Sequence, residues 1–466
     1  MKLVTLLVKP PPPLLQHPST MCCTPSTLLL LSLASILSVC SSDAKNMLPS
    51  EVETIFKIMD SISSDEKWRI SYPNPCNPGS TWLGIECKLG QDNHLHVSRL
   101  DFGTHPNPTC KNTATFPYEI FDLPHLQSVF FSQCFTHTKT TLSASPKRGG
   151  AFFDSSLQQL SLRSNPALVG PIPPQISFLK SLEILTLSQN RLSGRIPVEI
   201  FSLNSLVHLD LSYNMLTGPV PIQLGNLNNL QGLDLSYNSL TGPIPGTIGR
   251  LGMLQKLDLS SNSFIGTIPY SIEKLTLLTF MALSNNKLRG SIPKGILKLQ
   301  SLQYFIMDDN PMYIPLPAEF GKLVKLQELR LANSCYSGTI PPSFSLLVNL
   351  STLSLQNNRL TGKIPEGFSS LSRIYHLNLS GNLLGGVIPF NASFLKRLGR
   401  NLDLSGNPGL CLSPSEAYNN VKSGSGVGVC GTGSLIKKSQ AAAHGLSKLF
   451  FLFATLVFHV IHQKLF

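Results

Sequence analysis

The sequence lacks the short motifs with which common enzymes assemble a catalytic centre. No G-x-S-x-G motif, Walker motif, protein-kinase signature or H-E-x-x-H motif occurs among its 466 residues. Asp210, Asp234 and Asp258 each stand in the same D-L-S segment, so they are copies of one repeated pattern rather than a converging pair of carboxylates. We therefore expect no catalytic residues and no enzymatic activity.

Signals for metal and nucleic-acid binding are missing as well. No group of cysteines and histidines has metal-ligand spacing. The formal net charge is +12, and residues 45–433 carry 31 basic and 24 acidic side chains, but no single basic stripe is interleaved with aromatic residues. The basic excess suits an acidic cell-wall polysaccharide or an anionic membrane surface, or it serves only solubility. We expect no metal, no cofactor and no nucleic acid partner.

The apolar run near the N-terminus is too short to cross a bilayer. Residues 28–39 form an apolar core of about a dozen residues, and small residues follow it. This arrangement predicts a secretory signal peptide over residues 1–42. Because a proline run at 10–13 is a poor opening for such a signal, Met21 is an alternative start.

The apolar run near the C-terminus, residues 449–461, is also short of a bilayer's thickness. Small residues at 431–434 and a polar spacer precede it, as in glycosylphosphatidylinositol (GPI) attachment signals. We favour a GPI signal in the tail at 435–466, and a short membrane helix or plain secretion remains open.

What the sequence does contain is an asparagine that returns every 24 or 25 residues. Leucines in the pattern L-x-x-L-x-L precede each asparagine, and L-x-G-x-I-P follows it. Ser334 replaces the asparagine in the one missed position. The asparagines are Asn165, Asn190, Asn214, Asn238, Asn262, Asn286, Asn310, Asn358, Asn382 and Asn407. A fixed period of this length indicates a solenoid of stacked repeats.

One repeat explains the pattern physically. The alternation L-x-L predicts a short strand with inward leucines and outward intervening residues on a concave face. A buried asparagine after the strand can donate and accept hydrogen bonds, so we expect it to tie the backbone to the next repeat. Because a single repeat cannot bury its own leucines, stacking supplies the core.

The downstream segment resembles the plant extracellular type of leucine-rich repeat (LRR). Its G-x-I-P mark, which forms a second short strand in that family, occurs at Gly170, Gly194, Gly218, Gly242, Gly266, Gly290, Gly338, Gly362 and Gly386. The resemblance covers roughly residues 50–430 and implies an α/β solenoid, a plant-type leucine-rich repeat curved superhelix with N- and C-terminal caps. At 314–317 isoleucine replaces the glycine, so we expect a distorted lateral face there.

Within this family the chain looks most like receptor-like proteins without a kinase, in particular the Piriformospora indica-insensitive type. The resemblance implies an N-terminal LRR cap over 45–98, about 12–13 repeats over 99–410, and a C-terminal cap with a Gly/Ser-rich linker over 411–434. Apolar spacing predicts a helix from Ser50 to Ser71 in the first cap, and residues 94–102 supply the first strand.

Three of the ten cysteines, Cys22, Cys23 and Cys40, fall in the signal region, and most of the others lie in the caps and in one irregular region. The resemblance implies a disulfide between Cys76 and Cys87, and Cys430 would close the C-terminal cap with Cys411. In an oxidising compartment we expect Cys110 to pair with Cys134, which leaves Cys335 as a free, inert thiol.

The spacing between Cys134 and Asn165 is 31 residues instead of 24, which predicts an irregular loop near 135–156. We place it at Thr136 to Gly150. A tolerated surface loop and a contact element for a partner are both consistent with its polar, basic composition.

Three consecutive repeats differ from the others in the residue types at their concave positions. Aromatic and isoleucine side chains stand there beside mixed charges, the composition of an interface hot spot with a polar rim. The candidate residues are Phe280, Tyr304, Ile306, Asp308, Glu328 and Arg330. Phe130 is a further aromatic at a distant concave position. The alternative is that these side chains pack sideways on neighbouring strands.

Three glycosylation sequons, at Asn349, Asn378 and Asn391, are free of proline. Asn378 falls on a concave position, so a glycan there would obstruct the C-terminal part of that face and favour a ligand site on earlier repeats.

Together these features predict a glycoprotein of the secretory pathway, on the outer face of the plasma membrane or in the cell wall. The resemblance implies a receptor-like or co-receptor component in plant defence, symbiosis or development. Its partners would be a receptor kinase or another LRR ectodomain, a peptide or cell-wall carbohydrate ligand, and the membrane through the C-terminal anchor. The alternatives are a secreted inhibitor of cell-wall-degrading enzymes such as polygalacturonase, and a passive cell-wall scaffold.

Overall fold

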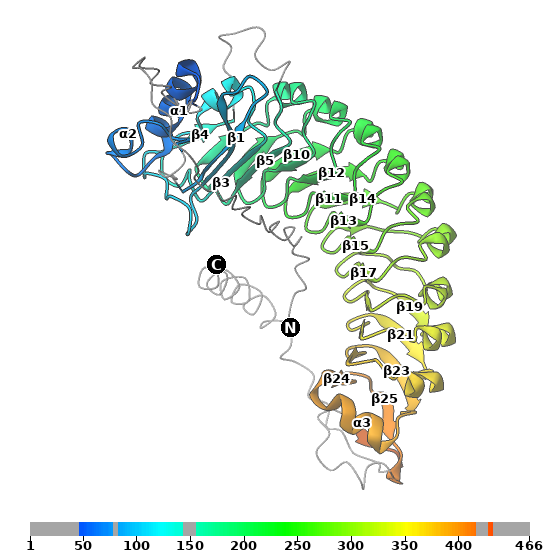
Figure 1. Cartoon of the computed structure of the whole chain (residues 1–466). Helices are drawn as coiled ribbons and strands as arrows, with labels where there is room; N and C mark the ends of the chain where they lie inside the picture. Colours follow the sequence, from blue (N-terminus) through cyan, green and yellow to red (C-terminus); the bar gives the residue numbers. More distant parts are fainter. Residues whose placement is uncertain (1–45, 78–82, 143–154, 416–426, 432–466) are drawn as a thin grey trace, which may run out of the picture. The chain divides into compact units, whose positions relative to one another are not determined.

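The computed structural model describes residues 46–77, 83–142, 155–415 and 427–431. They belong to one compact unit, a curved stack of repeats with helices at each end (Figure 1). The expected signal peptide, the tail at 435–466 and most of the linker lie outside the described residues.

A sheet of short parallel strands lines the concave side of the stack, as Figure 1 shows. Thirteen parallel strands follow one another in sequence order within the described residues. They are β2 (Leu95–Phe102), β3 (Ser128–Ser132), β5 (Gln159–Arg163), β7 (Ile184–Thr186), β9 (His208–Asp210), β11 (Gly232–Asp234), β13 (Lys256–Asp258), β15 (Phe280–Ala282), β17 (Tyr304–Ile306), β18 (Glu328–Arg330), β20 (Thr352–Ser354), β22 (His376–Asn378) and β24 (Leu402–Asp403).

The alternation of leucine with polar residues sets the two faces of this sheet. In β9, Leu209 is buried, whereas His208 is exposed and Asp210 is half-buried. Leu209 pairs in register with Leu233 of β11, so each strand adds its leucine to a continuous core. Full burial of such a side chain contributes about 2 kcal/mol, and the gain comes only from stacking.

The repeated asparagine forms the expected ladder between repeats. Asn214 Nδ2 donates to the carbonyl oxygens of Leu187, in the preceding repeat, at 2.8 Å and of Leu211, in its own repeat, at 3.1 Å. Its Oδ1 accepts from the Leu192 N–H at 3.0 Å. One side chain therefore joins the turn after a concave strand to the next strand of the preceding repeat, and it pairs three backbone groups at that corner.

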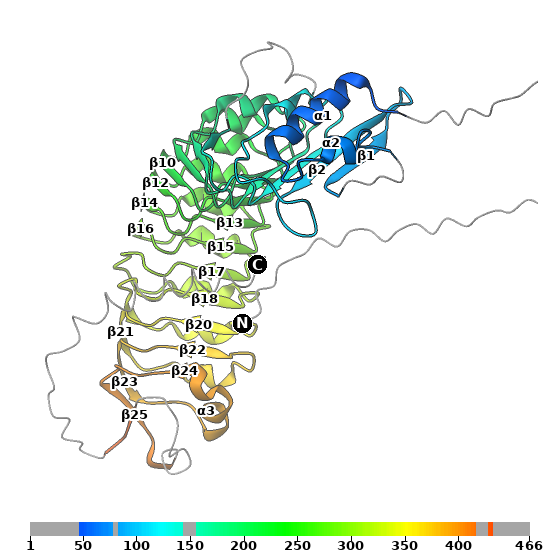
Figure 2. The ribbon, with the colours of Figure 1, turned by 90° about the vertical axis from the view of Figure 1, so that its left-hand side faces the viewer.

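A second set of strands runs along the lateral face, as the G-x-I-P segments imply (Figure 2). A seven-stranded sheet contains β4 (Thr140–Thr141), β6 (Leu168–Gly170), β8 (Arg191–Gly194), β10 (Met215–Pro219), β12 (Ser239–Pro243), β14 (Ser263–Gly266) and β16 (Lys287–Leu288). A five-stranded sheet contains β19 (Ser337–Thr339), β21 (Arg359–Gly362), β23 (Leu383–Val387), β25 (Gly409–Leu412) and β26 (Gly428–Val429).

The lateral sheet is interrupted at the irregular segment 311–317, where distortion was expected. The glycine of a regular repeat adopts a positive φ, such as 79° at Gly218, which a branched residue disfavours. With Ile314 in that place, the positive φ falls on Tyr313, at 52°, and only an isolated bridge joins Pro315 to Ser337. Ser334 contributes too, because its short side chain reaches the Met307 carbonyl oxygen at 3.3 Å but cannot span the corner as asparagine does.

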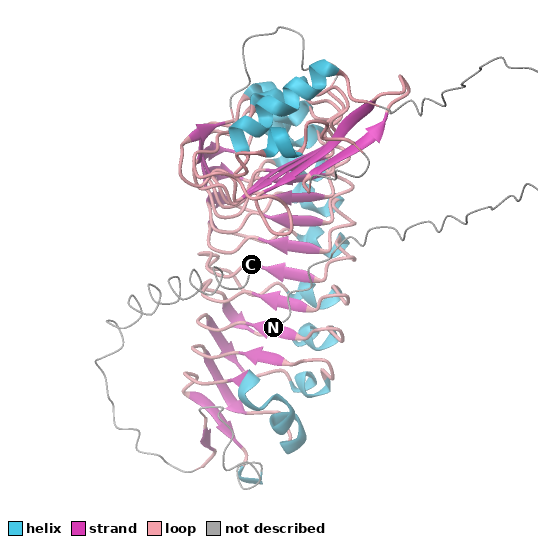
Figure 3. Cartoon of the chain, turned by 60° about the vertical axis from the view of Figure 1, so that its left-hand side comes forward, coloured by secondary structure: helices cyan, strands magenta, loops and turns pink. Residues whose placement is uncertain are grey.

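The convex side consists of single turns of 3-10 helix, and Figure 3 shows them opposite the concave strands. Most begin directly after the proline of the I-P pair, and an apolar residue in the middle of every turn except Gly399–Asn401 faces the core. They are η1 (Tyr118–Asp122), η2 (Pro174–Phe178), η3 (Val198–Ser202), η4 (Ile222–Asn226), η5 (Gly246–Arg250), η6 (Tyr270–Lys274), η7 (Lys294–Lys298), η8 (Ala318–Lys322), η9 (Pro342–Leu346), η10 (Glu366–Ser370) and η11 (Gly399–Asn401). The α/β solenoid is thus confirmed, with 3-10 turns as its repeating helices.

The N-terminal cap differs from the single helix expected over 50–71. Two helices, α1 (Pro49–Ile62) and α2 (Trp68–Ser71), are separated at Ser63, which forms a bridge to Cys110. Hydrogen bonds to the chain beyond the first strand thus replace helical ones at this point. Strand β1 (Ile85–Leu89) adds an antiparallel partner to β2, which periodicity alone did not predict.

Part of the segment after the cap that was expected to be a loop is a strand in the structure. Thr140 and Thr141 form β4 in the lateral sheet, and Thr140 Oγ1 accepts from the Phe116 N–H at 3.0 Å. The early part of the segment from Thr136 to Gly150 therefore belongs to the stack. Residues 143–154, the remainder of the expected loop, are not among the described residues.

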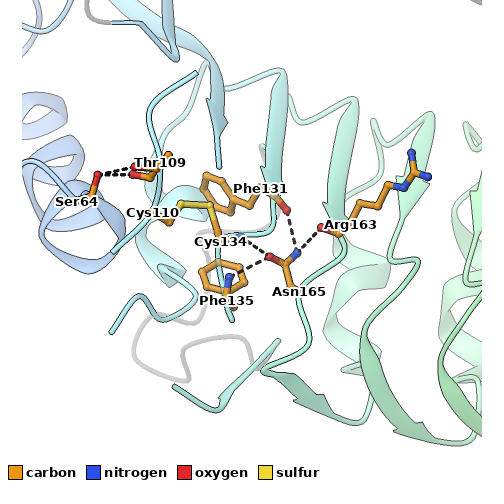
Figure 4. Close-up of a disulfide and its surroundings, with 8 residues drawn as sticks. All are labelled: Ser64, Thr109, Cys110, Phe131, Cys134, Phe135, Arg163 and Asn165. Atoms are coloured by element: carbon orange, nitrogen blue, oxygen red, sulfur yellow. Dashed lines mark hydrogen bonds between the residues drawn. A yellow bond between two sulfur atoms is a disulfide. The ribbon is translucent and has the colours of Figure 1, made fainter. Parts of the chain in front are cut away.

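The Cys110–Cys134 disulfide lies at the junction between cap and repeats, where Figure 4 shows it beside Asn165. Asn165 Oδ1 accepts from the N–H groups of Cys134 and Phe135, at 2.8 and 3.0 Å. Cys134 therefore occupies the turn that a ladder asparagine would occupy, and its sulfur fastens that turn to the cap.

At the other end, helix α3 (Ala392–Leu398) and strand β26 complete the stack. Cys411 and Cys430 are bonded there. Across the described part of the chain, none of the helices combines the length and the hydropathy needed to span a membrane.

Candidate binding surface on the concave face

Strands β15, β17 and β18 bring together the six candidate residues, which we call the concave patch. Phe280, Tyr304 and Glu328 are aligned across the three strands, and Ile306 pairs with Arg330 in the next row. Neighbouring strands lie about 4.8 Å apart, so the side chains of one row touch. The grouping predicted from three consecutive repeats is therefore present as one surface.

The aromatic pair of the concave patch is partly packed sideways. The ring centroids of Phe280 and Tyr304 are 5.9 Å apart at an interplanar angle of 42°, a favourable arrangement. The Tyr304 hydroxyl donates to Gln327 Oε1 at 3.2 Å. Both rings remain half-buried. Sideways packing, the alternative interpretation, thus applies to these residues without removing their rings from solvent.

Asp308 was expected to face solvent as a contact residue, but the structure shows that it is buried. Its residue exposure is only 4%. One carboxylate oxygen accepts from the Ala332 N–H at 2.7 Å, and the other accepts from Arg330 Nε at 2.8 Å. Its own N–H donates to Ser284 Oγ at 3.0 Å. Asp308 therefore supports the surface from beneath, because it satisfies buried donors and orients the guanidinium.

Arg330 is the polar centre of the concave patch. Its side chain is 41% exposed, and Glu328 Oε1 lies 3.7 Å from its Nη1. A guanidinium held by a buried carboxylate loses less conformational entropy when a partner binds. The arrangement can therefore present two rings, one isoleucine and one oriented cation to a ligand.

A second concave group, one the sequence reasoning passed over, lies on earlier repeats. The rings of Tyr213 and Tyr237 stack with centroids 4.1 Å apart at 10°, and each residue is nearly half exposed. Burial and the neighbouring Tyr237 raise the pKa of Tyr213. The signal was available, because the residue before the ladder asparagine is tyrosine in both repeats.

Asp210, Asp234 and Asp258 are aligned on neighbouring strands beside these tyrosines, and Lys256 is their basic partner. Lys256 Nζ lies 2.9 Å from Asp234 Oδ2. Burial lowers the pKa of the lysine, but Asp234, Asp258 and Asp210 together outweigh burial and raise it. Burial, followed by the charge of Asp234, raises the pKa of Asp258. Phe130 lies apart from both groups and is covered by the Arg99 guanidinium, 4.3 Å from its ring centroid.

The three sequon asparagines differ in their surroundings. Asn349 is in a polar network, because its Nδ2 donates to the Val324 carbonyl oxygen at 2.8 Å. Asn391 Oδ1 accepts from the Phe394 N–H at 2.9 Å and thereby caps α3. Asn378 lies in the row of Arg330, two strands away, so a glycan on it would border the concave patch.

The structure contains all three expected disulfides, Cys76–Cys87, Cys110–Cys134 and Cys411–Cys430. Cys335 is free and half-buried, as expected. The described residues hold no cluster of three His, Cys, Asp or Glu side chains placed to bind a metal ion.

Beneath the N-terminal cap a buried histidine joins α1 to β2. His96 Nδ1 lies 2.7 Å from Glu51 Oε2, and its Nε2 lies 3.0 Å from Asp92 Oδ1. Burial opposes the charge on His96, but these carboxylates outweigh it and raise its pKa. The hydrogen bond from His96, with further bonding to His94, lowers the pKa of Asp92 to about 2. The His125 ring packs against His96 at 3.9 Å between centroids.

Comparison with known sequences finds leucine-rich repeats directly. The family described as "Leucine rich repeat" matches residues 155–216 and 221–264, and a second model described as "Leucine Rich Repeat" matches 349–371. Together with the ladder and both strand sets, these matches show that the fold is a leucine-rich repeat solenoid.

Its curated relatives are proteins of Arabidopsis thaliana. Receptor like protein 29 is 62% identical over 170 residues, or 36% of each chain. Protein TOO MANY MOUTHS is 37% identical over 152 residues, which cover 31% of this chain and 28% of that protein. Piriformospora indica-insensitive protein 2 is 33% identical over 180 residues, 36% of this chain and 41% of that one. The matched regions thus span about a third of these relatives, which support the plant receptor-like assignment.

Solved structures with the same fold include plant receptor ectodomains. The complex of PEPR1 with AtPEP1 superposes with a TM-score of 0.67 at 29% identity, over 80% of this chain and 50% of that one. The plant peptide hormone receptor RGFR1 in complex with RGF2 gives 0.56 at 31% identity, over 73% and 47% of the two chains.

Proposed function

We propose that this chain is a cell-surface recognition protein that acts as a receptor-like or co-receptor component in plant signalling. The observation that carries the proposal is the concave patch, in which Asp308 orients Arg330 beside the Phe280 and Tyr304 rings. Tyrosine and arginine in a prearranged cluster are typical of binding hot spots.

The relatives support the same conclusion from another direction. Receptor like protein 29 shares 62% identity over the region it matches, and the neighbouring folds include a plant peptide hormone receptor in complex with RGF2. We infer that the concave patch binds a peptide segment, either a free ligand or part of a receptor kinase ectodomain that transmits the signal.

The remaining parts of the proposal concern the ends of the chain and its location. A signal peptide over 1–42 would deliver the protein to the secretory pathway, and a GPI signal at 435–466 would anchor it on the outer face of the plasma membrane. Release of the protein from intact cells by a phosphatidylinositol-specific phospholipase would support the anchor, whereas a retained species that still carries Phe466 would exclude it. Plant defence, symbiosis and development are the settings that the resemblance implies.

The test of binding uses paired variants of the whole chain. Tyr304→Ala with Arg330→Ala removes a ring and a cation from the concave patch. Tyr213→Ala with Arg163→Ala removes the same two groups from earlier repeats of the same face and is the matched control. Each tagged protein is used to capture partners from detergent-extracted plant plasma membranes, and captured receptor kinase ectodomains are quantified by mass spectrometry.

The proposal predicts that the Tyr304/Arg330 variant loses at least tenfold of the captured ectodomain, because hot-spot truncations cost about 1.4 kcal/mol or more. The control variant should capture as much as the unmodified chain. A loss confined to the control would move the contact to the earlier repeats and contradict the assignment. Equal capture by all three proteins would remove the concave face from recognition.

A further inference from the structure

The lateral face carries basic residues but no acidic residues in the segments that follow the ladder positions. The lateral segments are the seven residues after each ladder position, 191–197, 215–221, 239–245, 263–269, 287–293, 311–317, 335–341, 359–365 and 383–389, and none contains Asp or Glu. They contain six basic residues, which we call the lateral basic face: Arg191, Arg195, Lys287, Arg289, Arg359 and Lys363.

All six side chains belong to exposed residues on the outward positions of this face. In β8, β16 and β21 the first residue is exposed and the following leucine is buried, so Arg191, Lys287 and Arg359 point away from the core. Within the described part of the chain none of the six forms an ion pair with a carboxylate. Their charge is therefore available to a partner.

The glycines of the lateral strands allow these side chains to lie along the stack. A Cβ placed on Gly218 would be 3.1 Å from Arg195 Cγ, and one on Gly386 would be 3.2 Å from Lys363 Cγ. The apolar stems of Arg195 and Lys363 thus rest on the glycine of the following repeat. The six charges lie in three segments along the stack, 191–197, 287–293 and 359–365.

The dimensions and the neighbouring side chains narrow the class of partner. Arg191 and Arg359 are seven repeats apart, or about 34 Å at 4.8 Å per strand. Between the charges the outward positions carry hydroxyl side chains such as Thr217 and Thr241, and the Tyr313 ring is 62% exposed beneath the Arg359 guanidinium. A long, narrow ligand with regular negative charges and many hydroxyl groups fits this combination.

We infer that the lateral basic face binds a linear acidic polysaccharide built of uronic acid units. Its carboxylates would meet the basic side chains, and its hydroxyls would exchange hydrogen bonds with the serine and threonine residues. The charges extend over about 34 Å along the stack, which favours an extended polymer chain over a flat bilayer. This site is separate from the concave patch, so both can be occupied at once.

The test measures binding of polygalacturonate to the whole chain at low salt. The triple variant Lys287→Gln, Arg289→Gln and Arg359→Gln removes three charges from the face. The control Lys274→Gln, Lys322→Gln and Lys325→Gln removes the same charge from exposed lysines in or beside the convex turns η6 and η8. We expect the first triple to weaken binding at least tenfold, the control to weaken it less than threefold, and both to melt at the temperature of the unmodified chain.

Three further probes make the result specific. Anionic phosphatidylserine vesicles and poly-glutamate should bind more weakly than polygalacturonate, and the Tyr304/Arg330 variant should bind polygalacturonate normally. Equal losses in the two triples would overturn the site in favour of net charge alone. Stronger binding to vesicles would replace the polysaccharide with a membrane, and equal binding to poly-glutamate would replace it with an acidic peptide. Capture of receptor kinase ectodomains is measured in a separate assay. A failure to bind polygalacturonate would therefore leave the proposed function of the concave patch intact.

Discussion

The concave and lateral faces are built by the same repeats, yet their polar residues behave in opposite ways. Concave carboxylates outnumber the basic residues Arg99, Arg163, Lys256 and Arg330, and they are Asp101, Asp210, Asp234, Asp258, Asp308, Asp309, Glu328 and Asp403. Several are bonded to neighbours in the next repeat, as Asp308 is to Arg330. The lateral basic residues have no such carboxylate partners within the described ranges.

This difference shows what the repeat dictates and what it leaves free. The leucines and the ladder asparagine fix the core of both faces, whereas the outward positions can vary without loss of the stack. A prearranged, interlinked cluster is suited to one specific partner, and a stripe of free charges is suited to a repetitive polymer. The two faces therefore suit different ligands.

The largest expected effect on stability comes from removing a ladder asparagine, because its side chain joins the concave strands to the lateral strands. Asn238→Ala would leave the Leu216 N–H and the Leu211 carbonyl oxygen without their partner, and we expect the free energy of unfolding to fall by about 3 kcal/mol. Urea unfolding measures the loss. Asn238→Ser, which imitates Ser334, should lose less. An alanine variant as stable as the unmodified chain would show that the ladder is not what joins the faces.

A smaller effect should separate the two faces. Asp308→Ala removes a buried carboxylate that accepts from Ala332 and Arg330, so we expect a loss of about 2 kcal/mol. Arg359→Ala, on the lateral face, should change stability by less than about 0.5 kcal/mol. Chemical unfolding of the two variants side by side checks this. If both lose the same amount, the distinction between interlinked and free residues is wrong.

Tyr336 lies at an inward position of the irregular repeat, between the two faces. It is fully buried, and its hydroxyl is without a hydrogen-bond partner among the described residues. Since an unpaired buried hydroxyl is costly, Tyr336→Phe should raise the free energy of unfolding by about 1 kcal/mol. Leu216→Ala, which truncates the equivalent position of a regular repeat, should be destabilising in the same assay. A less stable phenylalanine variant would mean that the hydroxyl is satisfied by water.

A rise of pH above neutral should destabilise the cap, because His96 loses its charge there. The pKa of His96 is raised in the folded chain, so its interactions with Glu51 and Asp92 stabilise the protein fully below its unfolded value of about 6.5. That stability is lost as the pH rises through the raised folded value. The melting temperature should therefore fall by a few degrees above neutral pH, and His96→Gln should abolish this dependence. An unchanged slope in the variant would assign the titration to another group.

Much of this fold could be predicted from sequence, because the spacing of residues within one repeat determines where its strands and turns lie. The 24-residue period gave the strand alternation, the ladder and the lateral strands, and the single departure at Ile314 marked where the lateral sheet breaks. Two features depended on contacts that a pattern does not contain. The chain between α1 and α2 is held by Cys110 and its neighbours, and β4 pairs with a strand that is distant in sequence.

The candidate sites were predictable only in part. Register brought the six concave residues together, but alternation alone assigned Asp308 to solvent, although neighbouring donors draw its carboxylate inward. The lateral basic face escaped notice because its residues are dispersed along the sequence. It becomes visible when the residues one, three and five places after each ladder asparagine are compared.

If the concave patch and the lateral basic face bind different partners, one paired measurement should separate the two activities. The unmodified chain, the Tyr304/Arg330 variant and the Lys287/Arg289/Arg359 variant are each assayed for capture of a receptor kinase ectodomain and for binding of polygalacturonate. We predict that the first variant loses only the ectodomain and the second loses only the polysaccharide. A single variant that loses both ligands while its melting temperature is unchanged would contradict the assignment of different partners to the two faces.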